Sequence, residues 1–155
     1  LLTEAKNLAV KNVEKLSKLV SANAPIVGIE PSAILTLRDE YLDLVYPHQK
    51  ADAQHLAQHT FCFDEFISKE IDKGNIDREI FTQSEQIIKL HGHCHQKALS
   101  SMTPTKKILT FPINHEVHMI ASGCCGMAGS FGFEGSPTSC TTLARCRSEM
   151  VGEPC

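Results

Sequence analysis

The stretch "EQIIKLHGHCHQKALSSM", residues 85–102, changes its pattern halfway along. It begins with a short apolar run around Ile87 and Ile88, which indicates a buried strand. The second part, "HCHQKALSSM", is typical of the beginning of a helix. Strands that alternate with helices build parallel sheets, so this stretch predicts an α/β fold.

The remainder of the chain continues the alternation of helices and strands. Helices are predicted over residues 2–22, from Pro31 to just before Pro47, over 50–59 and over 61–73, and strands are predicted in "APIVGIEP", "KKILTFPI" and "EVHMIAS". In the second helix, Arg38, Asp39 and Glu40 lie largely outside the apolar face. The predicted architecture is therefore α/β, with parallel-sheet layers flanked by helices.

Composition narrows the class of protein. The 155 residues are 42% hydrophobic and 21% charged, which is typical of a globular chain with one real core. The formal charge of -3, without a basic block, excludes a nucleic-acid role, and no apolar run is long enough to span a membrane. The opening "LLTEAKNLAV" has neither Met nor a signal-peptide pattern, which we interpret as a fragment or a processed chain.

Cysteine usage indicates metal or redox chemistry. The seven cysteines are Cys62, Cys94, Cys124, Cys125, Cys140, Cys146 and Cys155. Their number is odd, and two adjacent cysteines cannot both close a loop by a disulfide in the usual way. A reducing compartment therefore fits better than a secreted disulfide scaffold.

Two groups of candidate ligands follow two different predicted strands. Cys94 follows the first, and Cys124 with Cys125 follows the second, in "ASGCCGMAG". Because the carboxyl ends of parallel strands share one edge of a sheet, we expect both groups at that edge. Thiolates are ligands for zinc and iron–sulfur clusters, and a histidine or a later cysteine would be the fourth ligand. The alternative is that each cysteine is a small buried hydrophobe, which the sequence favours for Cys62.

The histidines around Cys94 are further candidates. His93 and His95, with His91, could ligate a metal, donate hydrogen bonds to a cluster or orient the backbone. His48, His55 and His59 are expected in solvent, and His115 and His118 at a strand edge without a ligand role.

Five glycines, at every third position from 123 to 135, accompany the cysteine pair. Gly123, Gly126 and Gly129 would leave a bare face where a bulky cofactor can approach the backbone, or where helices pack closely. The pattern is not the dinucleotide fingerprint.

Three motifs together resemble a known family: "GIEPSAILTLRDEY", "LHGHCHQKAL" and "SGCCGMAGSFGFE". They are similar to the cysteine-rich (CCG) domains of the iron–sulfur oxidoreductase family. That family includes the iron–sulfur subunits of glycolate oxidase and heterodisulfide reductase and the C-terminal part of FAD-linked oxidases. The resemblance implies that Cys94, Cys124 and Cys125 hold a cluster of the [4Fe–4S] type, with zinc as the alternative.

The resemblance also implies a domain layout. Residues 1–134 would form the CCG-type region, with 1–75 as the end of one repeat and 85–134 as the start of the next, and 135–155 as an atypical tail. Two departures from the family pattern are Ala33, where a cysteine usually stands, and the spacing of the tail cysteines.

The function implied is electron transfer through iron–sulfur centres in an FAD-linked oxidoreductase acting on a 2-hydroxy-acid-type substrate. FAD would be bound by a fused domain or a partner subunit, and other iron–sulfur domains would be partners. A zinc-bound or metal-free docking module and a thiol–disulfide redox domain are the alternatives. The expected location is the cytoplasm, with peripheral attachment to the inner face of a membrane as a variant.

Overall fold

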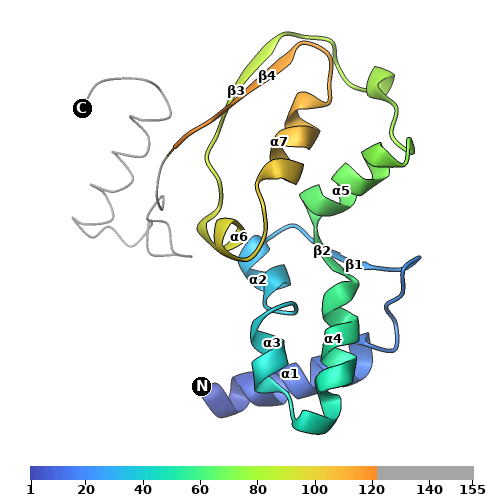
Figure 1. Cartoon of the computed structure of the whole chain (residues 1–155), viewed down its shortest axis with the longest axis vertical. Coiled ribbons are helices and arrows are strands. Elements are labelled where there is room, and N and C mark those ends of the chain that lie inside the picture. Colours follow the sequence, from blue (N-terminus) through green and yellow to red (C-terminus); the bar gives the residue numbers. More distant parts are fainter. Residues whose placement is uncertain (122–155) are drawn as a thin grey trace, which may run out of the picture. The chain divides into compact units, whose positions relative to one another are not determined.

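The computed structural model describes residues 1–121 of the chain. These residues form parts of two compact units, the first from Leu1 to Asn75 and the second beginning at Ile76. Both contain helices and short parallel strands (Figure 1). The fold is α/β, as the sequence predicted.

The first unit contains a two-stranded parallel sheet and several short helices. Its elements are α1 (Leu2–Leu16), β1 (Ile26–Gly28), α2 (Pro31–Leu35), α3 (Glu40–Leu44), η1 (Pro47–Gln49), α4 (Lys50–Gln58), β2 (Thr60–Cys62) and α5 (Phe63–Asp72). In the sheet, Ile26 pairs with Thr60 and Gly28 with Cys62. Helix α1 ends at Leu16, earlier than the predicted residue 22.

The helix predicted from Pro31 to Pro47 is two helices, α2 and α3. Its apolar residues belong to two separate clusters: Ile34 and Leu35 pack with Cys62, whereas Tyr41 and Val45 pack in the cluster that α1 and α4 share. One straight helix cannot direct a single apolar face into two clusters, so the chain breaks between them.

Strand β2 is a correction to the predicted helix over 61–73. Only Thr60, Phe61 and Cys62 are extended, and α5 begins at Phe63. Three residues are too few to show a period of two, and this strand exists because its backbone pairs with β1.

The described part of the second unit contains another parallel pair. Its elements are η2 (Arg78–Ile80), β3 (Gln86–Leu90), α6 (Cys94–Leu99), α7 (Thr103–Thr110) and β4 (His115–Met119). The pairing runs from Gln86 opposite His115 to Leu90 opposite Met119. The predicted strands in "EQIIKLHG" and "EVHMIAS" are therefore confirmed.

The strand predicted in "KKILTFPI" is wrong, because most of it is helix α7. Pro104 stands in the first turn of α7, where the missing N–H of proline costs no hydrogen bond. The apolar run of Ile108 and Leu109 is too short to distinguish a strand from a helix.

The strands are also less buried than predicted. Ile87 on β3 is 74% exposed, and Val117 is the only buried residue of β3 and β4. Within residues 1–121, no helix is both long and apolar enough to cross a membrane.

Candidate functional site

The carboxyl ends of β3 and β4 lie side by side. Leu90 is opposite Met119, and the backbone N–H of Ile120 donates a hydrogen bond of 2.9 Å to the carbonyl oxygen of Leu90. The two segments that leave the sheet therefore start from adjacent points (Figure 1). Cys94 follows Leu90 by four residues in the sequence, and Cys124 follows Met119 by five.

Three residues, 91–93, connect β3 to α6. Gly92 is buried, and a Cβ atom there would be 3.0 Å from both Cγ and Sδ of Met102. His93 is the N-cap of α6, and its carbonyl oxygen accepts a hydrogen bond of 2.9 Å from the N–H of Lys97. Cys94 is thus the first residue of a short helix that begins immediately beyond the sheet edge.

The side chains predicted around Cys94 differ in burial. His93 is exposed, while Cys94 and His95 are half-buried. His91 is half-buried as well, but its Nε2 atom is fully enclosed and has no hydrogen-bond partner among the residues described. A buried polar atom left in this way typically costs about 1–3 kcal/mol. The sequence grouped His91 with the other two histidines, and no sequence signal separates it from them.

The described residues alone do not form a metal site. In residues 1–121, no group of three or more His, Cys, Asp or Glu side chains could hold a metal ion. The predicted ligands Cys124 and Cys125, the glycines Gly123, Gly126 and Gly129, and the tail cysteines lie outside the described residues. The donors present beside β3 are a thiol and imidazoles, which suit zinc or iron. The residues at this edge therefore fit one part of such a site.

The corresponding edge of the first unit is chemically different. Beyond β1, the Glu30 side chain caps α2 and accepts a hydrogen bond from the N–H of Ser32, with Ala33 next in the chain. At the end of β2, Cys62 is 2% exposed. Burial, helped by the Glu65 and Asp64 carboxylates, raises the pKa of its thiol to about 11. Because metals bind the thiolate, Cys62 is a core thiol, as predicted, and not a prepared ligand.

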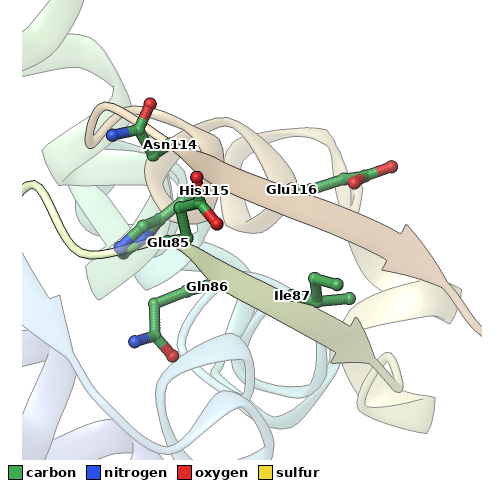
Figure 2. A pocket seen from close by; sticks show the side chains of 6 residues that line it. All are labelled: Glu85, Gln86, Ile87, Asn114, His115 and Glu116. Atoms are coloured by element: carbon green, nitrogen blue, oxygen red, sulfur yellow. The ribbon is translucent and has the colours of Figure 1, made fainter.

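A cavity of about 340 Å³ lies at the amino-terminal end of β3 and β4, away from Cys94. Figure 2 shows the side chains that line it: Glu85, Gln86, Ile87, Asn114, His115 and Glu116. Ligand sites of parallel sheets collect at the opposite, carboxyl edge. This cavity is therefore separate from the candidate site.

Comparisons with known proteins relate the chain to oxidoreductases. It is 28% identical over 127 residues to D-2-hydroxyglutarate dehydrogenase of Pantoea ananatis, in an alignment that covers 81% of this chain and 11% of that protein. It is 24% identical over 131 residues to D-2-hydroxyglutarate dehydrogenase of Haemophilus influenzae, with 81% and 12% covered. It is 26% identical over 141 residues to one subunit of the anaerobic glycerol-3-phosphate dehydrogenase of Escherichia coli K12, with 88% and 34% covered.

The chain thus spans about a tenth of the first two relatives and about a third of the last. All three relatives carry the names of dehydrogenases, and the last is by its name one component of a multi-subunit enzyme. No family model matches the chain. No solved structure matches it significantly.

Proposed function

We propose that this chain is an iron–sulfur electron-transfer domain of the CCG type, belonging to an FAD-linked oxidoreductase. The observation that carries the proposal is the parallel pairing of β3 with β4, which ends at Leu90 and Met119. Cys94 follows one strand end, and Cys124 and Cys125 follow the other within a few residues. The dehydrogenase names of the relatives support the same class of reaction.

Each residue at the edge has a distinct part in the proposal. The thiolates of Cys94, Cys124 and Cys125 hold the cluster, and Gly123, Gly126 and Gly129 leave room for it beside the backbone. A bound iron–sulfur cluster accepts and passes on single electrons. His93 and His95 tune the cluster from the start of α6, where the structure has them exposed and half-buried, respectively.

The rest of the enzyme would supply the flavin chemistry. FAD lies on a fused domain or on a partner subunit, which receives electrons from a 2-hydroxy-acid-type substrate. The small share of the D-2-hydroxyglutarate dehydrogenases that this chain spans supports a division of labour of this kind. Cysteines that serve as metal ligands must remain reduced, so the proposal includes a cytoplasmic location.

Metal analysis of the whole chain tests the proposal. The protein is purified without oxygen and reconstituted with iron and sulfide, and iron, acid-labile sulfide and the visible absorption spectrum are measured. We expect stoichiometric iron and a broad visible band, and loss of both in Cys94→Ser and in the double variant Cys124→Ser/Cys125→Ser. Cys62→Ala is the matched control, because it removes a buried thiol that the proposal does not use.

Zinc alone, or no iron after reconstitution, would exclude the proposed function for this chain. Retention of the cluster by the Cys124→Ser/Cys125→Ser variant would exclude the ligand set.

A zinc-bound or metal-free docking module is the second candidate, and exposed apolar residues around the sheets favour it. Ile29, just after β1, is 87% exposed, and Ile87 on β3 is 74% exposed. Parallel sheets are normally covered on both faces, so such residues fit a surface that another domain covers. A colourless protein that binds a flavoprotein partner without iron, and loses that binding in Ile87→Lys, would support this candidate over the first.

A further inference from the structure

We propose that the first unit binds a free amino acid with a cationic side chain, with arginine as the best fit, in a cavity between α1 and residues 46–52. The cavity has a volume of about 470 Å³. Sites for small molecules have volumes of roughly 300–1,000 Å³, so the size suits such a ligand. All the lining residues belong to the first unit, so this inference is independent of the proposed iron–sulfur site.

Two segments form the walls of the cavity. Val10 and Glu14 stand four residues apart on α1, and Lys18 follows the end of that helix. The other lining residues come from η1, the residue before it and the first turn of α4: Tyr46, His48, Gln49 and Asp52. Helices α1 and α4 share a core cluster that contains the fully buried Val13 and Leu56. Because such a core is close-packed, the distance between the two walls is fixed before any ligand binds.

Gln49 provides an unpaired polar group at the cavity. Its side chain is only 9% exposed, and its Oε1 atom is enclosed and has no hydrogen-bond partner among the residues described. Buried polar atoms of side chains are nearly always paired, so this exception requires an explanation. The terminal torsion of glutamine is soft, so the amide can turn toward a donor in the cavity without strain. An N–H group of a bound ligand would supply the partner that Oε1 lacks.

Three charged side chains define the charge of the ligand. Glu14, Asp52 and Lys18 all line the cavity, yet none of them forms an ion pair with another residue in the part of the chain that the structure describes. The cavity therefore presents two negative groups and one positive group. An amino acid with a cationic side chain carries the complement, which is two cations and one carboxylate. Hydrogen bonds between charged partners are about twice as strong as neutral ones.

The aromatic rings at the cavity favour a guanidinium over an ammonium group. The rings of Tyr46 and His48 are stacked, with centroids 5.8 Å apart and planes that differ by 6°. Nζ of Lys6 already lies 4.2 Å from the centroid of the Tyr46 ring, so this ring attracts a cation in the structure. A guanidinium is planar and stacks on aromatic faces, whereas an ammonium group acts as a compact charge. Arginine is therefore a better fit than lysine.

Calorimetric titration of the complete chain with L-arginine tests the inference. We expect saturable binding with one ligand per chain, and binding at least about tenfold weaker for L-citrulline, in which a neutral urea group replaces the guanidinium. Asp52→Asn and Glu14→Gln should each weaken the binding of arginine at least about tenfold. Asp43→Asn is the matched control, because it removes an exposed carboxylate that does not line the cavity.

Two further variants test the parts assigned to Lys18 and Gln49. Lys18→Met should abolish the preference for arginine over agmatine, which lacks the carboxylate that Lys18 would pair with. Gln49→Leu should weaken the binding of arginine without lowering the midpoint of urea unfolding, because it replaces an unpaired buried amide with an apolar group of similar size. Glu14, Lys18 and Asp52 are exposed, so their substitutions change the binding site and not the folded core.

Three results would overturn the inference. The first is the absence of saturable arginine binding below about 1 mM. The second is citrulline binding as tight as that of arginine, and the third is a loss of affinity in Asp43→Asn equal to that in Asp52→Asn. Each of them would leave the proposed function standing, since no metal or cluster takes part in this binding.

Discussion

We expect Glu65→Ala to lower the free energy of unfolding of the first unit by about 2–3 kcal/mol. One carboxylate oxygen of Glu65 has two partners at the junction of β2 and α5. It accepts a hydrogen bond of 2.9 Å from the N–H of Cys62, and it lies 2.7 Å from Nη1 of Arg38. The Glu65 side chain is 13% exposed and the Arg38 side chain 29% exposed.

The magnitude follows from these two interactions. Loss of a helix cap costs about 1 kcal/mol. Breaking an ion pair costs ~1 kcal/mol when the pair is exposed and ~3–5 kcal/mol when it is fully buried. Because Arg38 is partly exposed, we expect breaking its pair with Glu65 to cost about 1–2 kcal/mol. Arg38→Met removes only the ion pair and leaves the cap to Cys62, so it should cost about 1–2 kcal/mol.

Tyrosine fluorescence during urea unfolding reports on the first unit alone. The chain has no tryptophan and two tyrosines, Tyr41 and Tyr46, and both belong to that unit. Lys73→Met is the control, since it breaks a pair of 2.6 Å with Glu70 in which Lys73 is 62% exposed, and it should leave the midpoint unchanged. The reasoning is refuted if Glu65→Ala behaves like Lys73→Met, or if Arg38→Met costs as much as Glu65→Ala.

Three further substitutions test the packing, the thiol and the backbone. Gly28→Ala should destabilise the first unit by about 1–3 kcal/mol in the same fluorescence assay, because the added Cβ would be 2.5 Å from Cβ of the buried Ile34; an unchanged midpoint would contradict this packing. Burial raises the pKa of the Cys62 thiol from 9.0 to about 11, so the unfolded chain loses the thiol proton at lower pH than the folded chain does. The protonated thiol therefore contributes its full share of the free energy of unfolding below pH 9, and this share is lost between pH 9 and 11. Urea unfolding of Cys62→Ala across this pH range should not show the loss. Asn114 has a φ of 67°, which a β-branched residue adopts poorly, so Asn114→Val should destabilise β4 by about 1–3 kcal/mol and speed hydrogen exchange of its amides. Asn114→Gly should have a smaller effect, because it loses only the exposed hydrogen bond of 2.9 Å that Asn114 Nδ2 donates to the carbonyl oxygen of Gln83.

The sequence correctly predicted those helices and strands whose signals lie within a few neighbouring residues. Pro31 and Pro104 lie in the first turns of helices, and the β-branched run at Ile26 and Val27 is a strand. The strand-to-helix order around Cys94 is also as the sequence predicted. Preferences of this kind act within a few residues, so they can be read without knowing the partners.

The sequence did not predict those features that depend on a partner far away in the chain. Strand β2 exists because Thr60–Cys62 pairs with β1, and its three residues carry too little pattern to reveal that. The sequence placed Arg38 outside the apolar face, but it did not identify the partner of Arg38, which is Glu65, 2.7 Å away and 27 residues later in the chain. The break between α2 and α3 likewise results from two separate apolar clusters.

The candidate site shows the same division. The sequence alone determined which ligand types are present, and it predicted from parallel strand order that they meet at one edge. Only the tertiary structure decided the register, with Leu90 opposite Met119, and only it separated His91 from its two neighbours by enclosing Nε2. The register is set by the pairing of two strands that lie roughly thirty residues apart in the sequence, and no local preference of a residue specifies it.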